Sequence, residues 1–259
     1  MLVQKASAAI KSVPFLYNTL RPVKARMTAR GRAELRLRQY CRSVPRLVPQ
    51  PVFVKVGAND GVSGDPVSDI LLADERWKGL LIEPVPYVFD RLQANFHNAR
   101  RFSLEQVAIG ANAGQAVFYY VDAKAMASIP GLPDWYDQLG SFDKQHITKH
   151  LDGALTPFIV ESMVEVRPMA DVLKRNGIRE AHLLHIDTEG YDYEILKTVD
   201  LTHEAPWAIL VEHRHLPVPQ KAEMLLLLRS HGYSVDDCGT DYFAIHKRAL
   251  LAKLAKDLA

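Results

Sequence analysis

Two kinds of apolar pattern alternate along the chain from about residue 52 onward. Short runs of β-branched and aliphatic residues are typical of buried strands, and apolar residues at every third or fourth position are typical of amphipathic helices. The predicted strands are residues 52–56, 79–83, 102–109, 183–187, 208–212, 233–236 and 242–246. The predicted helices are residues 65–74, 87–96, 169–176, 191–199 and 220–231. Because strands alternate with helices, we expect an α/β domain with a mostly parallel seven-stranded sheet and helices on both faces.

The alternation is interrupted after the third strand. Residues 116–121 have the pattern of a hairpin strand, and residues 160–166 are expected to return antiparallel to them. The segment between them is rich in Pro, Gly, His and aromatic residues, and a loop this long in a compact domain is usually a functional lid. We therefore expect an inserted lid at about residues 122–160. Its candidate substrate-contacting residues are Trp135, Ser141, Phe142 and His146. The aromatic side chains suit stacking on a flat ligand, so we expect the segment as a whole to contact the substrate, although any single one of them is better suited to anchoring the loop.

Length and composition fit one main domain. A chain of 259 residues with 48% hydrophobic content can bury one substantial core. Its two cysteines, Cys41 and Cys238, are too few for a disulfide framework and lack metal-ligand spacing. No apolar run has the length that a bilayer requires. We expect a soluble cytoplasmic protein whose main domain spans residues 49–249.

Charge is distributed unevenly. The net charge is +2, yet residues 1–50 carry eleven Lys or Arg residues and one acid, Glu34. We expect a basic helical arm at residues 1–48 and a short C-terminal helix at residues 250–259. The arm either packs on the body or on a second copy of the chain, or it contacts an anionic surface or partner.

The ends of the first two strands carry features of a nucleoside site. Residues 57–61 read Gly-Ala-Asn-Asp-Gly directly after a strand, where a glycine lets the backbone approach a ligand and a following helix offers free N–H groups. Glu83 ends the second strand, where a carboxylate can accept hydrogen bonds from both ribose hydroxyls. The glycine spacing does not match the dinucleotide fingerprint and suits a nucleoside that carries a compact carboxylate. Each feature alone could be an ordinary turn or strand end, but together they favour a binding site.

Several motifs resemble the FkbM family of methyltransferases. They are Val-Gly-Ala-Asn-Asp-Gly at residues 56–61, Ile-Glu-Pro at residues 82–84 and Ile-Asp-Thr-Glu-Gly-Tyr at residues 186–191. Residues 139–143 and 211–213 are also similar to a common branch of that family, and the resemblance runs over about residues 50–246. It implies a Rossmann-like class I methyltransferase fold, S-adenosylmethionine as cofactor, and methyl transfer to a hydroxyl, often on a sugar or secondary metabolite.

The resemblance also implies which residues hold the cofactor. The expected cofactor contacts are Gly57, Ala58, Asn59, Asp60, Gly61, Glu83, Pro84 and Asp187. One residue departs from the pattern, because Lys55 stands where an aspartate is common in the broader fold. We therefore expect Asp60 to do more of the polar work at this turn.

The ends of the fourth and fifth strands supply catalytic candidates. Methyl transfer from a sulfonium needs an aligned acceptor and help in removing the hydroxyl proton. We expect Asp187, Glu212 and His213 to be catalytic and Glu189 to contact the substrate. A divalent cation held by Asp187 with Glu212 or His213 would lower the hydroxyl pKa, although no dense ligand cluster requires one. Alternatively, Asp187 or Glu189 caps the next helix. His185, inside an apolar strand, is expected to be a hydrogen-bonded core residue.

The leading hypothesis is an O-methyltransferase for a small polar acceptor, a sugar or a glycosylated natural product. One alternative is a nucleic-acid or protein methyltransferase recruited by the basic arm, and the other is a non-catalytic cofactor-binding module. The absence of an Asn/Asp-Pro-Pro-Tyr motif for flipped bases disfavours nucleic acid. The basic arm could also mediate a homo-oligomer.

Overall fold

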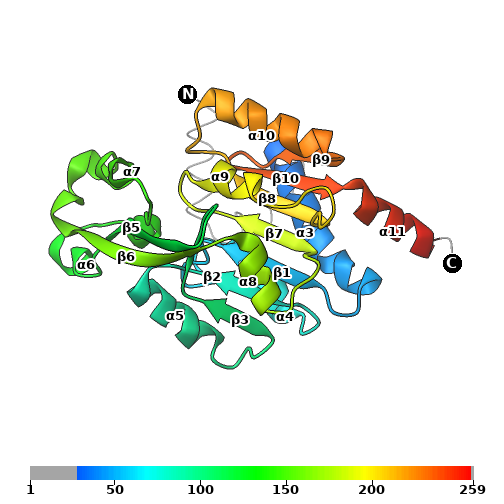
Figure 1. The fold of residues 1–259 in the computed structure, drawn as a ribbon, viewed down its shortest axis with the longest axis horizontal. Helices are drawn as coiled ribbons and strands as arrows, with labels where there is room; N and C mark the ends of the chain where they lie inside the picture. The colour runs from blue at the N-terminus through cyan, green and yellow to red at the C-terminus, as the bar shows by residue number, and fades with distance from the viewer. Residues whose placement is uncertain (1–27, 258–259) are drawn as a thin grey trace, which may run out of the picture.

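A seven-stranded sheet lies at the centre of the computed structural model, which describes residues 28–257 (Figure 1). The strand order is β3-β2-β1-β7-β8-β10-β9. The strands are β1 (Val52–Val56), β2 (Lys78–Ile82), β3 (Phe102–Glu105), β7 (Leu183–Ile186), β8 (Ala208–Glu212), β9 (Tyr233–Asp237) and β10 (Asp241–His246). β10 runs antiparallel to β8 and β9, and the pairs from β3 to β8 are parallel. The predicted mostly parallel seven-stranded sheet is confirmed.

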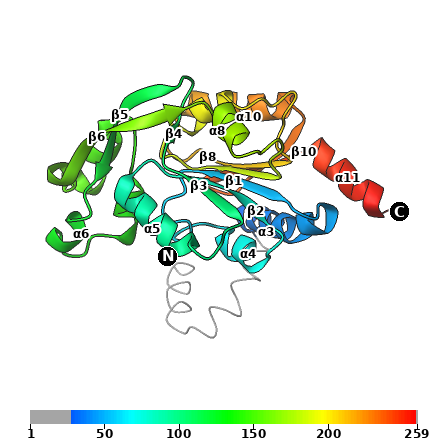
Figure 2. The ribbon, with the colours of Figure 1, turned by 60° about the horizontal axis from the view of Figure 1, so that its bottom comes forward.

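Helices pack against two separate apolar clusters on the sheet. Because side chains alternate along a strand, Val52, Val54 and Val56 of β1 join one cluster and Phe53 joins the other. The first cluster includes residues of α8 (Met169–Arg175), α9 (Asp192–Lys197) and α10 (Val218–Ser230). The second includes residues of α3 (Ala29–Leu47), α4 (Ser68–Ala73) and α5 (Pro86–Phe96). Figure 2 shows α8 and α10 on one side of the sheet and α3, α4 and α5 on the other.

The described part of the basic arm packs on the body. α3 begins after the N-cap Thr28, whose hydroxyl accepts a hydrogen bond from Gly31 N at 3.0 Å. Its buried face includes Leu37 and Cys41, and the Cys41 carbonyl accepts a hydrogen bond from Trp77 Nε1 at 3.2 Å. Arg36 and Arg38 of this helix form ion pairs with Asp236 and Asp69. Residues 1–27 of the arm lie outside the described residues, and the chain ends in α11 (Lys247–Asp257).

The predicted strand at residues 102–109 is divided in the structure. β3 is the edge of the large sheet, and the chain then leaves that edge as β4 (Ala108–Ile109), which pairs parallel to β6 (Ile159–Arg167). Within β4, Ile109 joins the core of the large sheet, while Ala108 joins a separate cluster with Val164. The apolar run at residues 102–109 is therefore divided between the seven-stranded sheet and a three-stranded sheet.

The insert is a small layer with its own core. The predicted hairpin is confirmed, since β5 (Gly114–Val121) pairs antiparallel to β6. Between them lie α6 (Ala125–Ser128), α7 (Lys144–Thr148) and the 3₁₀ turns η1 (Asp134–Gln138), η2 (Leu151–Gly153) and η3 (Thr156–Phe158). Their buried apolar residues are Val121, Ala125, Leu132, Tyr136, Leu139, Ile147 and Leu155. Among residues 28–257, no helix has both the length and the apolar character that crossing a bilayer requires.

Candidate functional site

A pocket of about 830 Å³ opens at the carboxyl ends of β1, β2 and β7 and beneath the insert. A parallel sheet of this kind binds ligands where the strand order reverses, and here β1 lies between β2 and β7. The predicted site residues in its lining are Gly57, Asn59, Glu83, Pro84, Ser141, Phe142, Asp187 and Glu189. The structure therefore brings cofactor and substrate candidates from four separate segments together.

The glycine turn after β1 is fixed between two neighbouring strands. Gly57 N and Ala58 N both donate to the Ile82 carbonyl, at 3.0 and 2.9 Å. Gly57 has a φ of +75°, and a Cβ at this position would lie 1.8 Å from the Asp187 carbonyl oxygen. Only glycine fits here, because any side chain would collide with the backbone that follows β7. Ala58 instead points into the core beneath the sheet.

Glu83 connects the turn to the end of β2. Its Oε2 accepts a hydrogen bond from Asn59 N, and its Oε1 accepts one from Val85 N, each at 2.9 Å. Burial raises the pKa of Glu83 to about 7, and these two hydrogen bonds limit the rise. Each carboxylate oxygen retains further acceptor capacity toward the pocket.

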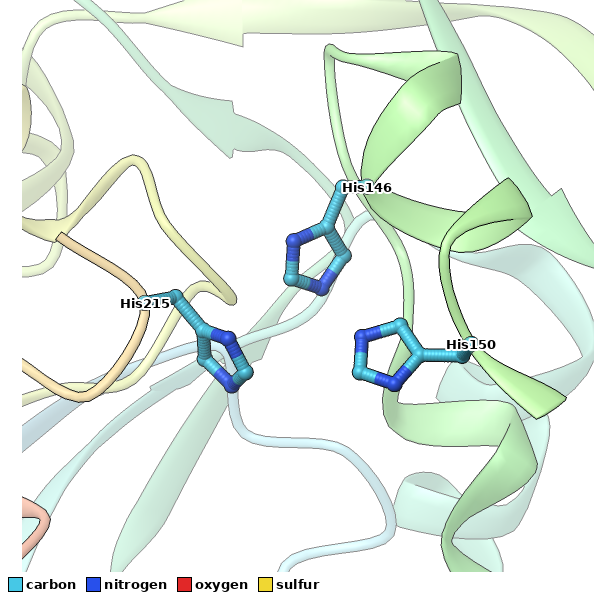
Figure 3. A group of neighbouring side chains, drawn as sticks. All are labelled: His146, His150 and His215. Carbon is cyan, nitrogen blue, oxygen red and sulfur yellow. The ribbon is translucent and has the colours of Figure 1, made fainter. Parts of the chain in front are cut away.

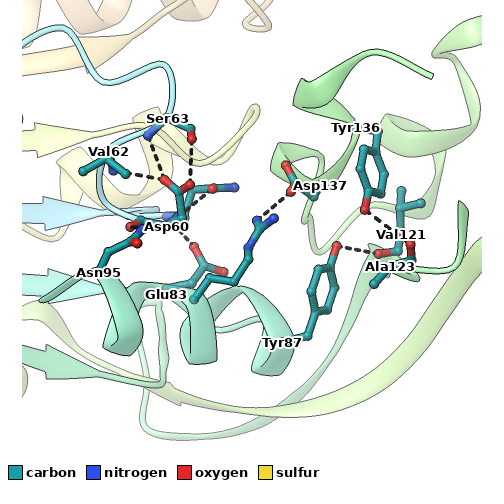
Figure 4. A network of polar contacts seen from close by, with 12 residues as sticks. Asp60, Val62, Ser63, Glu83, Tyr87, Asn95, Val121, Ala123, Tyr136 and Asp137 are labelled. Carbon is teal, nitrogen blue, oxygen red and sulfur yellow. Dashed lines mark hydrogen bonds and ion pairs between the residues drawn. The ribbon is translucent and has the colours of Figure 1, made fainter. Parts of the chain in front are cut away.

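Asp60 is turned toward its own loop. Its carboxylate accepts hydrogen bonds from Val62 N at 3.0 Å, Ser63 N at 2.7 Å and Ser63 Oγ at 2.6 Å (Figure 4). Neither Asp60 nor Gly61 is among the residues that line the pocket. We expected Asp60 to do polar work toward the cofactor. In this structure its carboxylate instead stabilises its own loop.

A buried ion pair at the end of β1 was missed by sequence reasoning. Lys55 Nζ lies 2.5 Å from Asp65 Oδ2, and both residues line the pocket. Burial would lower the pKa of Lys55, but the carboxylate of Asp65 outweighs that effect and raises it. His185 Nδ1 lies 3.4 Å from the same Asp65 oxygen, so His185 is a buried neighbour of this pair. The sequence offered one indication of this role for Asp65, namely that an aspartate stands just before the start of α4. In the structure, Asp65 Oδ1 accepts hydrogen bonds from the Val67 and Ser68 amides.

Three carboxylates gather behind the end of β7. Oxygens of Asp187, Asp192 and Glu212 lie within 4.8 Å of one another. Asp192 accepts hydrogen bonds from Thr188 N and Gly190 N at 2.8 and 2.9 Å. Asp192 therefore stabilises the turn before α9, a role that the sequence had offered to Asp187 or Glu189. Burial is the main cause that raises the pKa of Asp187, and burial with repulsion from Asp187 raises the pKa of Glu212 and raises that of Asp192 to about 7. Glu212 does not itself line the pocket.

Two other predicted residues lie away from the pocket lining. His213 is buried and stacks on Tyr242 with ring centroids 3.9 Å apart. Trp135 remains 40% exposed and meets His150 edge-on at 5.8 Å. His146 reaches the pocket indirectly, because its Nε2 lies 3.2 Å from the pocket-lining Glu189 Oε2.

Polar and aromatic contacts hold the insert over the pocket. Arg91 Nη2 of α5 pairs with Asp137 Oδ2 of η1 at 2.6 Å, and the Tyr87 hydroxyl donates to the Val121 carbonyl at 2.8 Å (Figure 4). Phe142 meets Tyr191 edge-on at 5.1 Å. The insert therefore forms one wall of the pocket.

The model of the methyltransferase FkbM domain matches residues 55–235. The chain belongs to the FkbM methyltransferase family. The resemblance in its motifs is thereby confirmed, and so are methyltransferase membership and the predicted Rossmann-like class I sheet. No curated protein sequence matches this FkbM chain.

Several solved methyltransferase structures are similar to this FkbM chain, at low identity and with TM-scores below 0.5. The FkbM methyltransferase from Methylobacillus flagellatus has a TM-score of 0.47 and 15% identity over 76% of this chain and 44% of that one. The precorrin-6y C5,15-methyltransferase from Geobacter metallireducens has a TM-score of 0.36 and 12% identity over 76% of this chain and 78% of that one. The N-terminal domain of human METTL16 in complex with SAH has a TM-score of 0.38 and 10% identity over 82% of this chain and 68% of that one. The chain spans less than half the length of the Methylobacillus protein.

Proposed function

We propose that the protein binds S-adenosylmethionine in this pocket and transfers the methyl group to a hydroxyl of a small polar acceptor, such as a sugar or a glycosylated natural product. The observation that carries the proposal is the arrangement of the Gly57 turn, the buried Glu83 carboxylate and Asp187 around one pocket. Membership of the FkbM family supports the reaction type. In this account, residues 49–249 are the catalytic domain and residues 122–160 are a lid over the acceptor.

The residues present fit the cofactor. The buried Glu83 carboxylate and the Gly57–Asn59 backbone line the same pocket, which suits a ligand with ribose hydroxyls and a charged amino-acid end. Glu83 would accept hydrogen bonds from the ribose hydroxyls, and the backbone near Gly57 and Asn59 would face the amino-acid part. When bound, the cofactor supplies an electrophilic methyl group on a sulfonium.

Asp187 is the residue we assign to the acceptor proton. Of the three predicted catalytic residues, it alone lines the pocket, where it follows β7 and lies beside the Gly57 turn. Its carboxylate would accept the hydroxyl proton as the oxygen attacks. Ser141 and Phe142 line the pocket from the insert, Glu189 lines it from the loop after β7, and all three would orient the acceptor.

The described part of the basic arm does not favour nucleic acid. Arg36 and Arg38 are already paired with acids of the body, so their charges are partly satisfied within the chain. Phosphate binding would have to compete with these pairs.

A methyl-transfer assay tests the proposal. Wild-type protein, Asp187→Asn and the control Asp200→Asn, which alters an exposed loop acid, are incubated with S-adenosylmethionine and a panel of sugars, glycosides, amines and RNA. We expect hydroxyl-dependent release of S-adenosylhomocysteine that falls by about 100-fold or more in Asp187→Asn and stays unchanged in the control. Turnover with amines or RNA and none with hydroxyl compounds would refute the proposed acceptor.

A further inference from the structure

Three imidazoles converge where the insert meets the strand ends. His146 lies on α7, His150 follows it four residues later, and His215 comes three residues after β8. Their ring centroids are 5.2 Å apart for His146 and His150, 5.0 Å for His146 and His215, and 5.9 Å for His150 and His215. One ring nitrogen from each lies within 4.8 Å of one from each of the others. Figure 3 shows the three rings around a common space.

Two of these histidines bury a nitrogen that has no hydrogen-bond partner among the described residues. They are His146 Nε2 and His150 Nε2. His146 is only 4% exposed, so its unpaired nitrogen is costly unless something else binds it. The side chain projects into the space between the rings, and a ligand there would satisfy it.

The carboxylate of Glu189 lies beside the three imidazoles. Glu189 Oε2 lies 3.2 Å from His146 Nε2 and 3.1 Å from His215 Nε2. The first contact lacks the geometry of a hydrogen bond, since His146 Nε2 remains without one. Glu189 has a φ of +55°, which is uncommon for a residue with a side chain. Glu212 Oε1 is 3.6 Å from His215 Nε2 and supplies a further oxygen nearby.

We propose that His146, His150 and His215 form a binding site for one divalent transition-metal ion, with the Glu189 carboxylate beside it. His146 lies on α7 and His150 lies two residues after its end, so one short segment presents two of the imidazoles. Three imidazoles and one carboxylate select Zn²⁺, Fe²⁺, Co²⁺ or Ni²⁺ over Mg²⁺ and Ca²⁺, which prefer oxygen ligands. At metal–nitrogen distances of about 2.1 Å, tetrahedral donors lie about 3.4 Å apart, so each ring must move inward by less than about 1 Å.

The proposed ion would join two parts of the fold. His146 and His150 belong to the insert, whereas Glu189 and His215 belong to the loops after β7 and β8. Glu189 also lines the pocket, so a bound ion would hold the insert at the rim of that pocket. The effect on methyl transfer rests on the proposed function, but metal binding itself does not.

The test is direct metal titration of the full chain, stripped with a chelator and freed of any affinity tag. Wild-type protein, His150→Ala and the exposed control His203→Ala are titrated with Zn²⁺ and Co²⁺. We expect about one ion per wild-type chain and a visible Co²⁺ absorption band typical of nitrogen ligands. Affinity should fall by at least about 100-fold in His150→Ala and be unchanged in His203→Ala. Glu189→Gln, which keeps the shape of the side chain, should also weaken binding.

Two results would overturn the site. One is that the wild-type protein binds neither ion more tightly than the millimolar range, which would leave a metal-free imidazole–carboxylate network. The other is that His150→Ala and Glu189→Gln bind as tightly as wild type, which would place the ion elsewhere. S-adenosylhomocysteine is titrated in parallel into the stripped protein. Nucleoside binding without metal binding refutes only this site, whereas metal binding without nucleoside binding refutes only the proposed function.

Discussion

The ion pair of Lys55 and Asp65 gives a prediction that can be worked from the structure. Both side chains are buried, with 6% and 2% exposed, and Lys55 Nζ lies 2.5 Å from Asp65 Oδ2. Asp65→Asn keeps a carbonyl oxygen for the Val67 and Ser68 amides but removes the negative charge. The Lys55 ammonium is then left buried beside a neutral group.

The expected cost follows from burial. Removing one partner of a buried pair destabilises a protein by about 3–5 kcal/mol, because the remaining charge is uncompensated. Asp69→Asn is the matched control, since Asp69 pairs with Arg38 but its side chain is 62% exposed. Its loss should cost about 0–1 kcal/mol. The double variant Lys55→Met with Asp65→Asn should recover most of the loss, because it removes both charges of the pair and leaves neither buried without its partner.

The free energy of unfolding is measured in urea at pH 7 by circular dichroism. Burial alone would raise the pKa of Asp65, but Lys55 and His185 hold it well below its usual range. The stabilisation by Asp65 is therefore present above the ordinary carboxyl pKa of about 3.9 and is lost as the pH falls below it. The reasoning is refuted if Asp65→Asn costs no more than Asp69→Asn, or if the double variant is no more stable than Asp65→Asn.

Three further predictions concern the turn, the ribose carboxylate and the insert. Gly57→Ala should lower the free energy of unfolding by more than about 2 kcal/mol. The control Gly131→Ala has a similar φ but nothing within 4 Å of the new Cβ, so it should cost about 1 kcal/mol. Equal costs for the two variants in urea unfolding would count against the clash at Gly57. Because burial raises the pKa of Glu83 from 4.5 to about 7, the folded state retains a proton that the unfolded state releases in this range. The free energy of unfolding should therefore fall as the pH rises from about 4.5 to about 7, by up to about 1.4 kcal/mol per pH unit. In Glu83→Gln this dependence on pH should be weaker than in wild type, and an equally steep dependence in a pH series of unfolding curves would contradict the prediction. Arg91→Met removes the partner of Asp137, so limited proteolysis should cleave the insert faster than in wild type, and an unchanged rate would show that this contact does not hold the insert.

The sequence pattern predicted an element correctly where the whole element lies in a single environment. β8 has the predicted bounds, Ala208–Glu212, because a fully buried strand is a continuous apolar run. The run at residues 102–109 has the same appearance, yet its second half pairs with β6. Sequence periodicity does not show which sheet an apolar residue enters, so this division required the long-range pairing.

The site was predictable where its residues belong to strand ends and turns. Gly57, Glu83 and Asp187 were found because parallel strands end at one edge of the sheet. Asp65 was missed because its pairing with Lys55 depends on the path of the loop before α4. The stacking of His213 on Tyr242 could not be foreseen, since it depends on the pairing of β8 with β10.

Isothermal titration with S-adenosylmethionine and S-adenosylhomocysteine tests the central claim most directly. The variants are Glu83→Gln and the control Glu105→Gln, which alters the acid at the end of the next strand, β3, outside the pocket lining. The account predicts micromolar binding by wild type and by the control, and affinity weaker by about 10- to 100-fold in Glu83→Gln, as expected for loss of hydrogen bonds to a charged group. No binding by the wild-type protein, or equal binding by Glu83→Gln, would contradict it.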